Sequence, residues 1–178
     1  MNAPPNWSGP VATMSYGGGG QSTAPRVLAD QLHRRSIGLH AANEFIVAAY
    51  PGHRTVRRHK FALALEDTDG VVRGVAITGT PIDRHLDTGW RLEVLQIATD
   101  DTPNVLAALY AAVAQAGVAI GFRRQDILTH THTNDPGTAL SAAGWVPVNA
   151  TKNGPTSREQ LVRWHAAAPT VGHVVRAA

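Results

Sequence analysis

The chain has 178 residues, 43% of them hydrophobic, which is enough apolar material for one domain with a single packed core. It contains no cysteine, which excludes disulfides, thiol catalysis and thiolate metal sites and is compatible with a reducing cytoplasm. The formal net charge is +3, no apolar run approaches the roughly 20 residues that cross a bilayer, and the first residues lack a signal-peptide pattern, so we expect a cytoplasmic protein without a membrane span.

The first elements follow a segment of low complexity. Residues 1–24 contain a run of glycines and little apolar surface, which predicts a flexible tail before a single domain over residues 25–178. Residues 26–35 have a mixed pattern that is compatible with a first strand. Residues 39–50 repeat apolar side chains at helical spacing and stop at Pro51, which predicts a helix.

A basic segment comes next. Residues 53–60 read HRTVRRHK, with six basic or potentially basic side chains in eight positions, and residues 33–35 add a second cluster. Such clusters favour a polyanionic partner, DNA in particular, through counterion release. The alternative is a solvated loop that is rich in arginine.

A hairpin and a long helix follow the basic segment. Residues 61–65 and 71–78 are short, apolar and partly β-branched, and the turn DTDG between them predicts a hairpin. Residues 79–89 form a polar loop and residues 90–98 a further strand. Pro103 suits the first helical position, with Thr102 or Asp101 as the cap.

The helix from residue 103 to about residue 120 is apolar almost all the way round. It must be buried on more than one side, by the sheet and by either another element or the second subunit of a homodimer. The remaining pattern gives a strand over 127–131, a helix over 136–143 that Gly144 closes, and strands over 145–148 and 160–165. The predicted packing tryptophans at strand ends are Trp90, Trp145 and Trp164.

This order of elements predicts a mixed α+β or α/β fold with helices on the faces of the sheet. At its centre, residues 91–110 read RLEVLQIATDDTPNVLAALY, so a strand runs through a polar turn directly into the apolar helix. Such a junction presents free main-chain N–H groups and the positive end of a helix dipole, which suit a phosphate or carboxylate. We therefore expect the ligand here.

Four segments also carry a resemblance to a known family: HRTVRRHKFALAL, GVAITGTPIDRHLD, LEVLQIATDDTPNVLAALYAA and ILTHTHTNDPGTALSAAGW. In this order they resemble the GNAT acyltransferases, and more narrowly the phage and prophage GNAT-like proteins related to Mom-type DNA-modification proteins. The resemblance covers roughly residues 36–165. It implies a mixed, mostly antiparallel central sheet with helices on both faces, and transfer of an acyl-type group from acetyl-CoA or a related donor to an amine, with a DNA nucleobase as the acceptor.

The resemblance also assigns the donor side of the site. In GNAT enzymes the turn after the central strand is rich in glycine, because the pyrophosphate of acetyl-CoA lies against bare main-chain N–H groups. Here the turn contains Asp100 and Asp101, whose carboxylates would repel a pyrophosphate, and Leu106 replaces a glycine. The donor-binding residues that the resemblance implies are Ala98, Thr99, Thr102 and Asn104; alternatively, Thr102 and Asn104 only begin the helix.

Glu93 on the central strand is similar in position to the general base of many GNAT enzymes. A carboxylate that is partly withdrawn from water gains basicity and can take a proton from an amine. The alternative is a simple pair with Arg91 on the same face of the strand. Leu140 occupies the place of the family's acid, so the candidates for that role are Tyr110, Thr138, Ser141 or water, unless Tyr110 is a core residue.

The resemblance places the basic loop on the acceptor side, with His53 as a possible proton acceptor and Arg54, His59 and Lys60 as substrate contacts. The further substrate-binding candidates are Arg91, His130, His132, Asp135 and Thr138. The spacing His-x-His also suits a metal pair if a third ligand comes near, but alone it is weak evidence, and we predict no metal.

Two other functions stay open at this point. One is a conventional N-acetyltransferase for a small molecule or a protein. The other is a non-catalytic module that keeps the GNAT fold and binds nucleic acid or protein, since a fold does not guarantee an activity.

Overall fold

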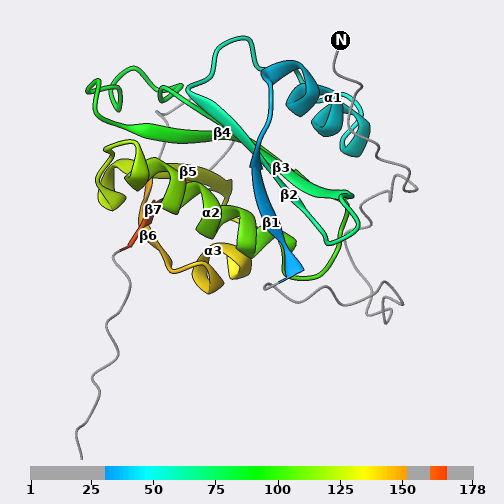
Figure 1. Cartoon of the computed structure of the whole chain (residues 1–178). Helices are drawn as coiled ribbons and strands as arrows, with labels where there is room; N and C mark the ends of the chain where they lie inside the picture. The colour runs from blue at the N-terminus through cyan, green and yellow to red at the C-terminus, as the bar shows by residue number, and fades with distance from the viewer. Residues whose placement is uncertain (1–30, 152–160, 168–178) are drawn as a thin grey trace, which may run out of the picture.

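The computed structural model describes residues 31–151 and 161–167, in which one seven-stranded sheet carries three α-helices (Figure 1). The elements in chain order are β1 (His33–Ser36), α1 (Leu39–Ala49), β2 (Phe61–Glu66), β3 (Val72–Gly79), β4 (Leu92–Thr99), α2 (Val105–Ala119), the 3-10 helix η2 (Arg124–Asp126), β5 (Ile127–His132), α3 (Thr138–Ala142), β6 (Trp145–Thr151) and β7 (Leu161–Ala166). The strands lie in the order β1-β2-β3-β4-β5-β7-β6.

The predicted fold class is confirmed. Every neighbouring pair of strands is antiparallel except β4 and β5, which are parallel. The predicted order of strands and helices is also confirmed, with boundaries that move by at most three residues except at the first strand, which the sequence predicts over residues 26–35 and which is β1 at His33–Ser36. The predicted tail over residues 1–24 lies outside the described residues.

The helices lie on both faces of the sheet, as Figure 1 shows. On one face α2 packs against β2, β3 and β4 and against α3, with Leu109 and Val113 fully buried. On the other face α1 packs against β2, β3 and β4, and Ile46 and Ile77 belong to a second apolar cluster there. The sheet and α3 thus bury the apolar sides of α2 within one chain. No described helix is long and apolar enough to span a membrane.

Two local expectations are wrong. The helix α2 begins at Val105 rather than at Pro103, and its N-cap Asn104 has a left-handed backbone and no capping side chain. Thr102 and Asp101 do not cap α2, because the loop is held by a separate set of bonds. Trp90 is 77% exposed and therefore no packing residue, whereas Trp145 and Trp164 are buried as predicted.

The parallel pair of β4 and β5 is short. It pairs Leu92 with Ile127 and Glu93 with Leu128, and no further residues, although both strands continue. A bulge interrupts the pairing of β4 with β3 at the same level, between Gln96 and Val94. The strands therefore part directly after Glu93, where the main-chain ladder between them stops and the hydroxyl of Thr129 donates to the carbonyl of Val94 at 3.5 Å.

Candidate active site

The central contact of the site joins Glu93 of β4 to His130 of β5. The Nδ1 of His130 lies 2.9 Å from Oε1 of Glu93, and Oε2 accepts the main-chain N–H of Ile82 at 2.7 Å. Glu93 is only 5% exposed, whereas the side chain of His130 is 19% exposed. Both carboxylate oxygens are therefore occupied, and only the imidazole reaches the surface.

The register of the strands explains why these two residues meet. Glu93 pairs with Leu128 across the parallel ladder, and side chains alternate between the two faces of a strand. His130 lies two residues after Leu128, so it is on the same face as Glu93, just beyond the point where the strands part. The prediction that Glu93 is partly withdrawn from water is confirmed, but its partner is His130 and not Arg91.

This contact fixes the orientation of the imidazole. An ionised carboxylate only accepts hydrogen bonds, so Nδ1 of His130 must donate to it. In the neutral ring, Nε2 is then the nitrogen with the free lone pair. It has no hydrogen-bond partner within the described residues and is not a buried atom, so it is open to a ligand.

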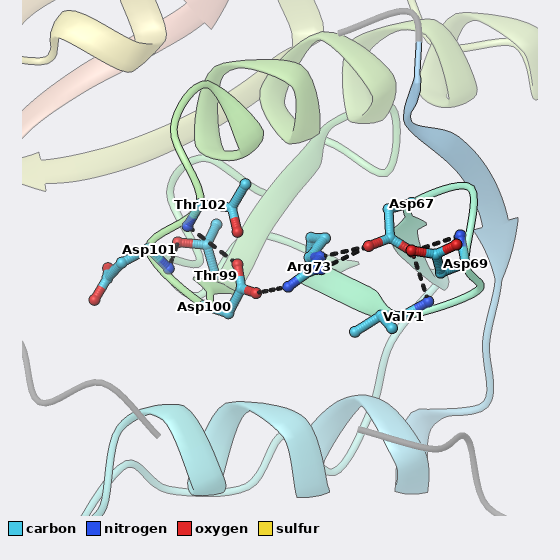
Figure 2. A network of polar contacts seen from close by, with 8 residues as sticks. All are labelled: Asp67, Asp69, Val71, Arg73, Thr99, Asp100, Asp101 and Thr102. Carbon is cyan, nitrogen blue, oxygen red and sulfur yellow. Dashed lines mark hydrogen bonds and ion pairs between the residues drawn. The ribbon is translucent and has the colours of Figure 1, made fainter. Parts of the chain in front are cut away.

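A second network holds the loop between β4 and α2 (Figure 2). The guanidinium of Arg73 on β3 contacts Asp67 at 2.6 Å and Asp100 at 3.0 Å. The other oxygen of Asp100 accepts the N–H of Thr102 at 3.1 Å, and the hydroxyl of Thr99 accepts the N–H of Asp101 at 3.3 Å. Figure 2 shows these contacts in one row from the β2–β3 turn to the start of α2.

The loop does not fit the pyrophosphate of acetyl-CoA. Two of its main-chain N–H groups are already satisfied by Thr99 and Asp100. Burial, and after it the charge of Asp100, raises the pKa of Asp101. The two neighbouring carboxylates would repel a pyrophosphate. Thr102, an expected donor to the cosubstrate, gives its N–H to Asp100 instead.

The other expected donor-side residues are spread over different environments. Ala98 is buried in the apolar cluster under α1, and the hydroxyl of Thr99 is used within the loop. Asn104 is exposed, and its main-chain N–H has no partner within the described residues. The donor-binding role of these four residues stays a prediction.

Tyr110 lies on the opposite face of the sheet from Glu93. Its ring packs edge to face on Trp145, and its main-chain carbonyl accepts the indole N–H of that residue. Burial raises the pKa of Tyr110 to about 12, and the side chain of Thr129 only partly opposes this. The hydroxyl is therefore protonated at neutral pH, next to the strand β5 that borders the split.

The basic loop lies beside the same part of the sheet. The main-chain carbonyl of Arg54 accepts the side-chain N–H of Gln96 at 2.7 Å, and the N–H of Lys60 donates to Thr78 at 2.8 Å. These bonds hold both ends of the loop against β4 and β3. His59 is exposed, and His53 packs against Tyr50 and forms no hydrogen bond with Glu93.

The remaining expected residues are also placed. Asp135 accepts the N–H of Gly137 before α3, and the exposed Thr138 begins that helix. His132 lies on the same face as His130, and Arg91 donates to the carbonyl of Leu86. Within the described residues, no group of three potential ligands supports the metal alternative for the two histidines.

Sequence reasoning missed Arg73 and Arg163. Arg73 lies in a strand that reads as a simple hairpin, and its partner Asp100 is 27 residues away. Arg163 is paired with His130 across β5 and β7, but the sequence only indicates a final strand there. No local sequence pattern predicts either contact, because both depend on the order of strands in the sheet.

No family model matches the sequence, and no curated protein matches it. Solved structures do match. Spermidine/spermine N-acetyltransferase from Vibrio cholerae, solved with manganese ions, has a TM-score of 0.56 at 12% identity, over 77% of this chain and 92% of that chain. The same species' spermidine N-acetyltransferase with CoA and spermine has a TM-score of 0.52 at 12% identity, over 76% and 95% of the two chains.

A third match is yncA of Salmonella typhimurium, provisionally named an acetyltransferase and solved with its cofactor acetyl-CoA. Its TM-score is 0.54 at 10% identity, over 76% of this chain and 92% of that chain. At such identities a likeness shows the fold alone. The chain therefore has the fold of the GNAT N-acetyltransferases, and the narrower resemblance to the phage branch receives no support from these matches.

Proposed function

We propose that this protein is an N-acyltransferase, which moves an acyl group from an activated donor to an amine of a small molecule or a protein. The observation that carries the proposal is the Glu93–His130 contact at the point where β4 and β5 part. It combines a buried carboxylate, an oriented imidazole and a break in the sheet. The fold supports it, because solved acetyltransferases share it.

In this proposal His130 is the general base and Glu93 is a positioning residue. The amine nitrogen forms a bond to the acyl carbon, and Nε2 of His130 takes the proton that the nitrogen loses. The bond from the acyl carbon to the leaving group breaks, and the leaving group keeps the electron pair. A proton from water then neutralises the leaving group, because the expected acid Tyr110 is buried on the opposite face of the sheet.

The arrangement of charges explains why Glu93 needs the histidine. Both of its oxygens are engaged, and the side chain is buried, so a substrate amine would have to displace a bond to reach it. His130 offers a lone pair at the surface, and the carboxylate stabilises the imidazolium that forms. By its resemblance to GNAT enzymes, the sequence indicates Glu93 as the general base. In this proposal His130 is the base, and Glu93 orients it.

The test is an acyl-transfer assay with a panel of amines and two donors, acetyl-CoA and S-acetyl-pantetheine, read by mass spectrometry of the products. Glu93→Gln and His130→Gln should each lower kcat by about 100-fold or more, and the double variant should be little worse than either. His33→Gln, an exposed histidine on β1 at the sheet edge, is the control. Full activity in folded His130→Gln would exclude the histidine as base.

A binding function has separate support from the basic loop. Its side chains from residues 53–60 include six basic or potentially basic groups, and almost all are exposed. The expectation of a DNA nucleobase as acceptor rests on this loop and on the resemblance, and it stays a prediction. Binding to DNA that weakens steeply with salt would favour it.

A further inference from the structure

The face of the sheet around Glu93 carries more basic or potentially basic side chains than acidic ones. Antiparallel pairing places Arg163 of β7 directly opposite His130, and the two side chains share a face. Among the residues of β4, β5 and β7 on this face, Glu93 is the one carboxylate. The basic or potentially basic residues of these strands on the same face are His130, His132, Arg163 and His165.

Within residues 31–151 and 161–167, Arg163 has no acidic partner. Its Nε is buried without a hydrogen-bond partner, and it forms no ion pair within the described residues. A buried donor that is left unsatisfied costs free energy, and in native proteins it calls for a specific explanation. A bound anion would supply both the missing acceptor and the missing charge.

A second guanidinium, that of Arg91, lies near the same place. His165 follows Arg163 on the same face, donates through Nδ1 to the carbonyl of Gln125, and has a buried Nε2 without a partner. Burial lowers the pKa of His165, and the charges of Arg163 and Arg91 lower it further. Both arginines are therefore close enough to disfavour protonation of the His165 imidazole.

The carboxylates near this face that the structure describes are engaged elsewhere or exposed. Asp126 is paired with Arg123 at 2.6 Å. In the loop before β4, Asp83 and Asp87 are exposed, and each accepts a main-chain N–H of its own loop. The α-helix α1 packs on β2, β3 and β4, and α2 and α3 lie on the opposite face, so no described α-helix packs closely over this face of β5 and β7.

We propose that Arg163, with His132 beside it, binds a compact anionic group of the acceptor, a phosphate or a carboxylate, while the amine of the same molecule meets His130. Paired side chains lie about 5 Å apart and alternate strand residues about 7 Å apart. A small molecule with an amine and an anion at that separation fits both contacts. The inference rests on the proposed function, and it excludes a polyamine as the preferred acceptor, because like charges would meet.

Binding of inorganic phosphate tests the site without turnover. Arg163→Gln should weaken phosphate binding by about tenfold or more, and Arg163→Lys should retain most of it. Arg34→Gln is the matched control. Arg34 is an exposed arginine on β1, and this substitution removes the same positive charge away from the site. Calorimetry on the full chain gives the affinities, and thermal unfolding shows that each variant is folded.

Unchanged phosphate binding in folded Arg163→Gln, or no binding by the wild type at tens of millimolar phosphate, would overturn the inference. If Arg163→Gln does not fold, His132→Gln carries the test, and a phosphate affinity equal to that of the wild type in folded His132→Gln would count against the inference.

Turnover provides the second arm. Ethanolamine and phosphoethanolamine form a pair of amines that differ by one phosphate, and we expect a kcat/KM about tenfold higher for the phosphorylated member, a preference that Arg163→Gln removes. A short single-stranded oligonucleotide distinguishes a nucleic-acid phosphate from a small-molecule phosphate as the source. Turnover without this preference would reject the anion site and leave the N-acyltransferase, whereas phosphate binding at Arg163 without any turnover would reject the N-acyltransferase and leave the anion site.

Discussion

Arg73 and Asp100 form an ion pair of 3.0 Å that ties β3 to the loop before α2. Arg73 also contacts Asp67, so one guanidinium holds the β2–β3 turn and the loop together (Figure 2). Within the loop, Asp101 and Asn104 have left-handed backbones, with φ of 63° and 69°. Aspartate and asparagine tolerate this conformation better than other non-glycine residues, and the network holds the loop in it.

Removing the guanidinium should therefore weaken the fold. Arg73→Met leaves the carboxylates of Asp67 and Asp100 without their counter-charge, and we expect a loss of about 2–3 kcal/mol in the free energy of unfolding. The control is Arg35→Met, which breaks a more exposed ion pair with Glu66 and should cost less than about 1 kcal/mol. Equal losses in the two variants, measured by urea unfolding, would show that the network adds no special stability.

The same network makes stability depend on pH. Burial alone would raise the pKa of Asp67, but the N–H of Val71 and the guanidinium of Arg73 outweigh it and hold the pKa below its ordinary value of 3.8. A lowered pKa in the folded state stabilises the protein above the unfolded value, and this stability is lost as pH falls through the folded pKa.

Asp67→Asn should accordingly be less stable than the wild type at pH 7, and the difference should shrink as pH falls below 3.8. Unfolding curves for both proteins between pH 7 and acid conditions measure it. A difference that stays constant with pH would mean that the ionisation of Asp67 does not contribute.

The structure of the loop before α2 also predicts the relative affinities of the protein for two acyl donors. Because the loop does not fit a pyrophosphate, acetyl-CoA and S-acetyl-pantetheine should bind with affinities that differ by less than about tenfold, or 1.4 kcal/mol. Calorimetry with both compounds measures the ratio. A strong preference for acetyl-CoA would show that the loop rearranges to receive the pyrophosphate.

Asp101→Asn offers a separate probe of the loop. Burial and Asp100 raise the pKa of Asp101, so its ionised form is unfavourable in the folded protein above the ordinary pKa. Asparagine removes the charge and tolerates the left-handed backbone. We expect a gain of about 0.5 kcal/mol at pH 7 by thermal or urea unfolding, and a gain that disappears at acid pH, where the aspartate is protonated. A loss of stability at pH 7 would contradict this.

Gly137 permits a close approach of Trp164 behind the site. A Cβ at this position would lie 2.1 Å from the indole ring, and the backbone φ is +64°. Gly137→Ala should therefore cost about 3 kcal/mol or more in the free energy of unfolding. Gly144→Ala has a similar φ of +78° but open space around its Cβ, and should cost about 1 kcal/mol. Similar losses in both variants would mean that the backbone alone matters.

Local chemistry explains which expectations were correct. Short, apolar and partly β-branched runs and the DTDG turn specify the β2–β3 hairpin, and Pro51–Gly52 ends α1. The start of α2 was misplaced, because Pro103 and Thr102 are favourable types near a helix start, but Asp100 competes for the N–H of Thr102. Trp90 was assigned to the core by type, whereas its position outside a paired strand leaves it exposed.

The sequence by itself determined the order of the elements, which residues of a strand share a face, and that Glu93 is a candidate site residue. Side-chain periodicity and turn chemistry are local properties, so they can be read from single segments. Only the tertiary structure decided that Glu93 meets His130 across 37 residues, that Arg163 lies opposite His130, and that Arg73 reaches Asp100. Each of these contacts depends on which strands are neighbours and in which register they pair. The packing of the whole sheet decides which strands are neighbours and in which register they pair. This information is not present in any single segment of the sequence.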